Sequence, residues 1–132
     1  MNRKLTAKGE GNMGLTRIQV TLKRPGSLAP TFTSDFLVDT GAIDSMAPAS
    51  ELRAIGIRAI GERAYELADG TEENYEYGLV EIKFMDEITA GRVIFGPEDV
   101  EPILGVTALE SAGLSVDPSR ETLRRMPTIP LK

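Results

Sequence analysis

The stretch Phe-Leu-Val-Asp-Thr-Gly-Ala at residues 36–42 runs from an apolar segment directly into an Asp-Thr-Gly turn. The apolar residues predict a buried strand, and the glycine lets the backbone fold back sharply after it. One carboxylate, Asp39, is thereby delivered to a tight loop. Farther along, residues 102–105 (Pro-Ile-Leu-Gly) form a second apolar segment that stops at a glycine. We expect the first stretch to be the most informative part of the chain about function.

The residue types in the chain narrow the chemistry that Asp39 can perform. The sequence contains 0 His and 0 Cys, which excludes Ser-His and Cys-His nucleophile systems and zinc sites built from imidazole or thiolate. Two carboxyl groups at hydrogen-bond distance can share one proton and act on a bound water. The chain offers a single Asp-Thr-Gly. The nearest second candidate, Asp69-Gly70-Thr71, lies at a polar hairpin tip. The second carboxylate is therefore expected from another copy of the chain, related by a two-fold axis.

The order of these segments resembles that of the retropepsin-like aspartic proteases, the single-lobe relatives of pepsin. Residues 37–42 resemble the catalytic loop, and residues 103–105 resemble the hydrophobic-hydrophobic-glycine segment of its partner loop. Residues 67–71, between the two, resemble the flap hairpin of bacterial members. Leu109 and Gly113 fall where the family has a short helix. The resemblance implies a mainly β fold, a closed acid-protease-like β barrel with one or two short helices.

The resemblance also implies an activity and a set of site residues. The family members are aspartic endopeptidases, in which water is activated between two aspartates, here the Asp39 carboxylates of a homodimer. In the family, the residue at Thr40 hydrogen bonds across the dimer axis, and the residue at Gly41 contacts substrate through its carbonyl. No metal and no organic cofactor is expected, and the partners are a peptide or protein substrate and a second copy of the chain. Substrate contacts are expected at Ala42, Asp44, Ala68, Asp69, Gly70 and Ile103.

Two departures from the retroviral pattern bear on this expectation. Retroviral members carry an Asp after the catalytic Gly-Ala and an Arg after the second glycine, and the two residues pair. This chain has Ile43 and Val106 at those positions, which suggests an apolar contact in place of a buried ion pair. The expected flap also lacks a glycine-rich tip and carries Glu72 and Glu73.

Other interpretations of the same residues stay open. A catalytically silent module of the same fold, which dimerises or binds peptides, is one alternative. A Mg²⁺ site held by Asp39 and Asp44 is another, although the chain lacks phosphate-cradling glycines. In purely structural terms, both aspartates could cap turns and Asp69-Gly70 could be an ordinary hairpin turn. We expect Tyr65, Tyr75 and Tyr77 to have packing roles.

Composition and charge agree with a single globular domain. Hydrophobic residues make up 41% of the 132 residues and the net charge is −5, which argues against nucleic acid or an anionic membrane as the main partner. No apolar run is long enough to span a membrane, and the N-terminus lacks the apolar core of a secretory signal. Because the chain lacks cysteine, a cytoplasmic location is expected. We expect a disordered extension at 1–14, the protease-like domain at 15–126 and a proline-containing tail at 127–132.

Periodicity and turn signals predict mostly strands. Strands are expected at 18–22, up to Asp39, at 65–68 and 75–84 on either side of Asp69-Gly70, at 93–95, and in a last hairpin of 114–116 and 122–124. Helices are expected at 48–55 and after Thr107, where Thr107 and Glu110 match a capping box and Gly113 ends the helix.

Overall fold

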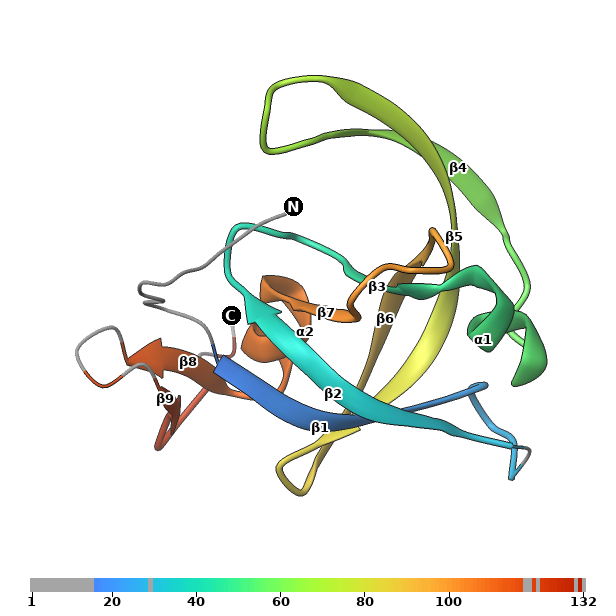
Figure 1. Ribbon diagram of the computed structural model, residues 1–132. Coiled ribbons are helices and arrows are strands. Elements are labelled where there is room, and N and C mark those ends of the chain that lie inside the picture. The colour runs from blue at the N-terminus through green and yellow to red at the C-terminus, as the bar shows by residue number, and fades with distance from the viewer. Residues whose placement is uncertain (1–15, 29, 118–119, 121, 130, 132) are drawn as a thin grey trace.

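The computed structural model describes residues 16–28, 30–117, 120, 122–129 and 131. The predicted N-terminal extension at 1–14 lies outside the described residues. Strands dominate, as expected, and two short helices accompany them (Figure 1). The elements are β1 Thr16–Lys23, β2 Phe32–Asp39, β3 Ser45–Pro48, α1 Ala49–Ala54, β4 Gly61–Glu66, β5 Glu72–Phe84, β6 Glu87–Gly96, β7 Ile103–Gly105, α2 Val106–Ser111, β8 Leu114–Asp117 and β9 Thr122–Arg125.

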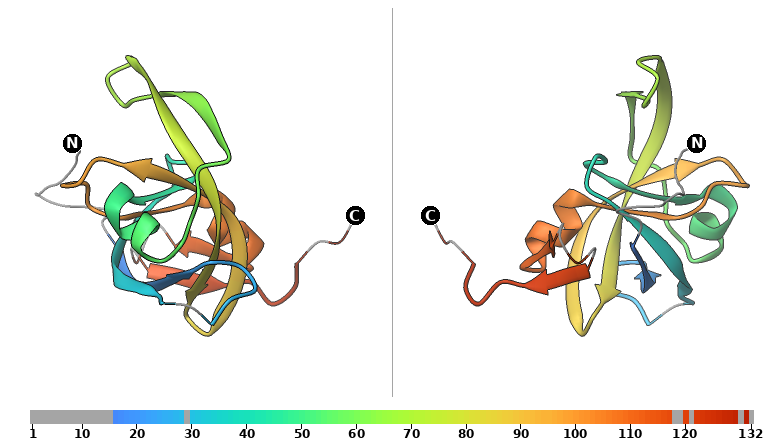
Figure 2. Two further views of the ribbon diagram at one scale, coloured as in Figure 1. Left: turned by 90° about the vertical axis from the view of Figure 1, so that its right-hand side faces the viewer. Right: turned by 60° about the vertical axis from the view of Figure 1, so that its left-hand side comes forward.

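Seven strands form one sheet that curls into a ring. Their order is β1-β2-β7-β3-β6-β5-β4, and β1 also pairs with β5. This additional pairing, which includes Leu22 opposite Ile82, joins one edge strand of the sheet to β5. The result is a ring-like sheet from which the outer part of the β4–β5 hairpin projects (Figures 1 and 2). Strands β8 and β9 form a separate two-stranded sheet.

The hydrophobic core fills the inside of this ring. In β1 and β2, burial alternates along the strand, so that Val20, Leu22, Phe36 and Val38 point inward. This alternation is the period of two that a strand with one buried face requires. Fully burying side chains of this size stabilises the fold by about 1.5–3 kcal/mol each. The core therefore fixes the direction in which β2 delivers its last residue, Asp39.

Two hairpins give the ring its long strands. Strands β5 and β6 are joined at Met85 and Asp86, whose φ angles are 51° and 63°. Positive φ at both central residues is the backbone geometry of a type I′ turn, whose twist suits a tight hairpin. Strand β6 begins at Glu87, well before the predicted start at residue 93. The predicted hairpin around Asp69-Gly70 is present as β4 and β5.

The two helices begin and end differently from one another. Helix α1 follows Pro48 as its N-cap and buries Leu52. For α2, the predicted capping box is wrong, because the N-cap is Gly105 and no side chain caps the helix. Thr107 lies inside the first turn instead. The end of α2 matches the prediction, since Gly113 adopts a φ of 76° just after the helix, in the conformation that glycine tolerates best.

Two further features complete the fold, the last hairpin and the length of the helices. The predicted last hairpin is present as β8 and β9, with Val116 opposite Leu123. Among the described residues, no helix is long and apolar enough to cross a membrane.

Candidate active site

The site is built where β2 and β7 run side by side. These strands are parallel, with Leu37 opposite Ile103 and Asp39 opposite Gly105. The Leu37 N–H donates to the Pro102 carbonyl at 2.9 Å. The structure therefore brings together the two apolar segments that the sequence singled out, although more than sixty residues separate them along the chain. Asp39 is half-buried at the point where both strands end.

A tight turn follows Asp39. The Gly41 N–H donates to Asp39 Oδ1 at 2.9 Å, and the Ala42 N–H donates to the Asp39 carbonyl at 3.1 Å. The first of these bonds fixes the orientation of the carboxylate, and both require the sharp turn that the sequence predicts. Thr40 and Gly41 are exposed, and Ala42 is half-buried. One carboxylate oxygen of the half-buried Asp39 is thus held by the backbone of its own loop.

The loop is held from its other side by the start of α2. The Val106 N–H donates to the Ala42 carbonyl at 2.8 Å, and the Thr107 N–H donates to the Ile43 carbonyl at 3.2 Å. Backbone hydrogen bonds therefore join the segments that contain Ile43 and Val106, the two residues expected to form an apolar contact. Ile43 is 70% exposed, so its side chain is not buried within this chain.

A buried serine completes this attachment. Ser45 is a buried polar residue, at 2% exposure, and its Oγ accepts a hydrogen bond from the Gly105 N–H at 3.0 Å. Gly105 itself is packed so closely that an added Cβ would lie 2.6 Å from the Ile43 carbonyl oxygen. Sequence reasoning missed Ser45, because it lies in the short strand β3, which carries no periodic signal. Its role depends on contact with a residue sixty positions away.

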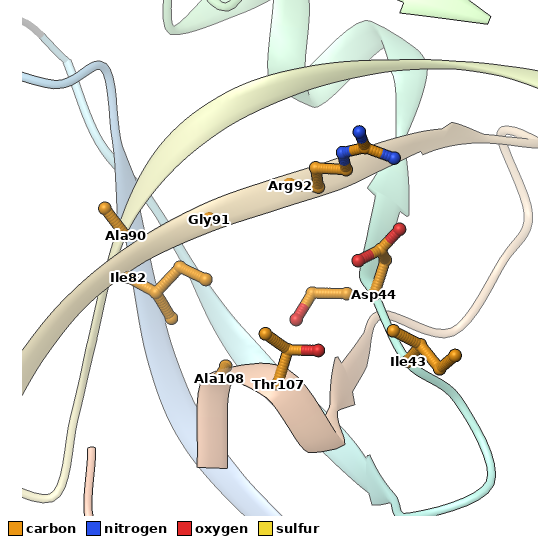
Figure 3. Close-up of a pocket in the computed structure, with 9 residues that line it drawn as sticks. Ile43, Asp44, Ile82, Ala90, Gly91, Arg92, Thr107 and Ala108 are labelled. Carbon is orange, nitrogen blue, oxygen red and sulfur yellow. The ribbon is translucent and has the colours of Figure 1, made fainter. Parts of the chain in front are cut away.

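Asp44 connects this loop to the β4–β5 hairpin. The Tyr65 hydroxyl of β4 donates to Asp44 Oδ2 at 3.0 Å. Partial burial raises the pKa of the Tyr65 hydroxyl, the bond to Asp44 raises it further, and the Arg92 guanidinium opposes both. Asp44 and Arg92 line the same small pocket (Figure 3). Sequence reasoning did not single out Arg92 and assigned Tyr65 a packing role.

The hairpin tip is ordered by its own hydrogen bonds. Asp69 Oδ1 accepts from the Thr71 N–H at 3.0 Å and from the Thr71 hydroxyl at 2.7 Å, and these bonds lower the pKa of Asp69. The Leu67 N–H donates to the Thr71 carbonyl at 2.7 Å. Ala68, Asp69 and Gly70 are all exposed. Tyr65, which lies nearer the base of the hairpin than these three residues, makes the hydrogen bond to the loop after Asp39.

Ile103 is half-buried and lies between two strands. It is opposite Leu37 of β2 and Met46 of β3. Its neighbour Leu104 is fully buried in the core. Ile103 therefore has the partial exposure that a substrate contact would need.

The residues that could hold a metal are few. Within the part of the chain that the structure describes, no group of three or more Asp, Glu, His or Cys residues is arranged to bind a metal ion. Asp44, which the Mg²⁺ alternative requires together with Asp39, accepts a hydrogen bond from Tyr65. The site therefore presents the half-buried carboxylate of Asp39 on a loop held by backbone hydrogen bonds.

Solved structures that are similar to this chain include two retropepsin-like ones. One is a retropepsin-like aspartic protease from Rickettsia conorii, with 21% identity, a TM-score of 0.45, and coverage of 78% of this chain and 84% of that chain. The other is the retroviral protease-like domain of Ddi1 from Leishmania major, with 17% identity, a TM-score of 0.49, and coverage of 86% and 90%. No protein-family model and no curated protein matches the chain. Both solved structures are retropepsin-like, as the sequence predicts, and at these identities the likeness concerns the fold alone.

Proposed function

We propose that the chain is an aspartic endopeptidase whose catalytic pair consists of Asp39 from each of two subunits. The observation that carries this proposal is the position of Asp39. It ends a buried strand in register with Gly105, and its Oδ1 is held by the Gly41 N–H at 2.9 Å. The loop after it is attached to the start of α2 by backbone hydrogen bonds. Acid–base catalysis needs a carboxylate that is held in a fixed orientation at an exposed turn. A purely structural turn does not need this.

The chemistry needs one ionised and one protonated carboxyl group. The ionised Asp39 takes a proton from a bound water as the water oxygen attacks the peptide carbonyl carbon. The protonated Asp39 of the second subunit donates its proton to the carbonyl oxygen, which gives a tetrahedral diol. The first Asp39, now protonated, gives its proton to the peptide nitrogen, the C–N bond breaks, and a hydroxyl of the diol loses its proton to the ionised Asp39 of the second subunit. A carboxylic acid and an amine leave, and one proton again remains on the pair. Two carboxyl groups at hydrogen-bond distance share one proton, which supplies both roles.

The second subunit is needed because the chain supplies half of this pair. Thr40 and Ile43, on either side of the turn, are exposed, and Ile43 places an apolar side chain, 70% exposed, beside the site. A two-fold axis through this loop would cover Ile43 and bring the two carboxylates together. The β8–β9 hairpin, which forms a sheet separate from the ring, would be a second contact surface in such a dimer.

The substrate would lie between this loop and the β4–β5 hairpin. The half-buried residues Ala42, Asp44 and Ile103 line the loop side of that region. Ala68, Asp69 and Gly70 would close over the peptide and exclude water.

A cleavage assay on Asp39→Asn tests the proposal. The substitution keeps the shape of the side chain and its acceptor for the Gly41 N–H, and removes the group that carries the proton. Asp35→Asn is the matched control, because Asp35 is an exposed aspartate of the same strand. With a mixed-peptide substrate, we expect loss of cleavage in Asp39→Asn alone, and no effect of EDTA on the wild type. Undiminished cleavage by folded Asp39→Asn would exclude the assignment, and an inactive wild type would favour the silent module.

A further inference from the structure

The outer part of the β4–β5 hairpin lies at the edge of the sheet, and its side-chain attachments include an ion pair between Arg53 and Glu76 at 3.4 Å. In the order of the described sheet, β4 is the edge strand and pairs with β5 alone. The Ile60 N–H donates to the Tyr77 carbonyl at 2.8 Å and closes the base of the hairpin, where β5 pairs with β6 from Tyr77 opposite Ile94. Farther out, the Tyr65 hydroxyl donates to Asp44 Oδ2 at 3.0 Å. This bond reaches from the hairpin to the segment just after the Asp39 turn.

A second set of contacts supports the Tyr65 side chain. The Arg92 guanidinium of β6 stacks on the Tyr77 ring at 4.2 Å from its centroid, and it also interacts with the Tyr65 hydroxyl. The Tyr65 and Tyr75 rings lie 6.3 Å apart between centroids, tilted by 54°. The hydroxyl of Tyr65 therefore interacts with both a carboxylate and a guanidinium, and its ring contacts a neighbouring ring.

We propose that the Tyr65 hydroxyl is a latch that holds the β4–β5 hairpin against the loop after Asp39, with Asp44 as the acceptor. Because the acceptor is a carboxylate, the bond is stronger than one between neutral groups. Opening the latch would let the tip at 68–71 move away from the loop as a unit, since the tip keeps its internal hydrogen bonds. Tyr65 is thus a positioning residue. The effect of Tyr65 on substrate binding rests on the proposed function, whereas its effect on the position of the hairpin does not.

The chain offers matched variants for this test. Tyr65→Phe removes the hydroxyl and keeps the ring. Tyr75→Phe removes a hydroxyl from the neighbouring tyrosine, whose hydrogen-bond partner is Glu73 of the same hairpin, so it should leave the latch closed. Asp44→Asn keeps an oxygen acceptor for Tyr65, and Asp44→Ala removes it. A latch requires Tyr65→Phe and Asp44→Ala to behave alike, and Asp44→Asn to be milder.

The position of the hairpin can be measured by electron spin resonance between two labels. Because the chain contains 0 Cys, cysteines introduced at the exposed residues Ala68 and Glu110 would take spin labels selectively. Diluting labelled into unlabelled chain restricts the measurement to distances within one subunit. We expect Tyr65→Phe and Asp44→Ala to raise the population of displaced hairpins about tenfold, in line with the loss of one hydrogen bond to a charged group. An unchanged distance distribution, or an equal change in Tyr75→Phe, would overturn the latch.

Kinetics then separates the latch from the proposed function. If the chain cleaves peptides, Tyr65→Phe should raise KM more than it lowers kcat, because hairpin closure is part of binding. If the wild type cleaves nothing, the proposed function fails, while the distance measurement still decides the latch.

Discussion

Gly105→Ala tests how closely β7 is packed against the loop that carries Asp39. A methyl group at this position would lie 2.6 Å from the Ile43 carbonyl oxygen and 2.7 Å from the carbonyl carbon and oxygen of Asp44. These neighbours are backbone atoms, so no side chain can rotate away to relieve the overlap. Overpacking of a dense core costs about 1–3 kcal/mol, and we expect the upper end, about 3 kcal/mol, because the loop itself must move.

Gly91→Ala provides the control, because a Cβ at Gly91 meets nothing within 4 Å. This variant should match or slightly exceed the wild-type free energy of unfolding, by up to about 0.5 kcal/mol, since alanine restricts the unfolded chain.

Urea unfolding at one fixed protein concentration measures the difference between the two variants, because association would change the apparent stability. With a slope of about 2 kcal/mol/M, the midpoint of Gly105→Ala should fall by about 1.5 M. Equal midpoints for the two variants would refute the close packing of β7 on the loop.

Two further predictions concern hydrogen bonds that support the site and α1. Ser45→Ala leaves the buried Gly105 N–H without its acceptor, so urea unfolding should show a free energy of unfolding lower by about 1–3 kcal/mol; no change would mean that the bond contributes nothing. Glu98 accepts hydrogen bonds from the Ser50 hydroxyl and N–H at the start of α1, and these bonds lower the pKa of Glu98. Its contribution to stability is therefore present above the pKa of an unfolded glutamate and is lost as the pH falls through the lower folded value. Glu98→Gln should accordingly lower the Tm at pH 7 and approach the wild-type Tm in acid, and a Tm difference independent of pH would contradict this account.

Much of the fold could be predicted because it depends on local patterns. In β1 and in the second half of β5, apolar residues at every second position mark the buried face. The apolar run before Asp39 marks β2. Asp69-Gly70 fixes the turn between β4 and β5 through the residue types that such a turn requires. The pairing of β2 with β7 also agrees with the expected relation between residues 37–42 and 103–105. The strand and turn patterns need no knowledge of distant contacts, whereas the relation between β2 and β7 was expected from the family resemblance.

The features that sequence reasoning missed depend on contacts between distant segments. Strand β3 has four residues and ends in Pro48, so it is too short for a periodic signal, and it forms because β6 and β7 lie beside it. The capping-box prediction at Thr107 was wrong because tertiary hydrogen bonds place the helix start at Val106, against the loop after Asp39. The contact of Tyr65 with Asp44 and Arg92 joins three separate segments, and no local pattern indicates it.

The shared catalytic pair is tested most directly by sedimentation and peptide cleavage measured together over a dilution series. One Asp39 per chain supplies half of the pair, so activity per chain should fall in proportion to the fraction of dimer once the concentration drops below the dimer dissociation constant. Adding excess Asp39→Asn chain at a constant total concentration would check that the loss follows from unmatched pairs. The account predicts inert monomers. A monomer with the full activity per chain would contradict the shared pair and, with it, the proposed aspartic protease mechanism.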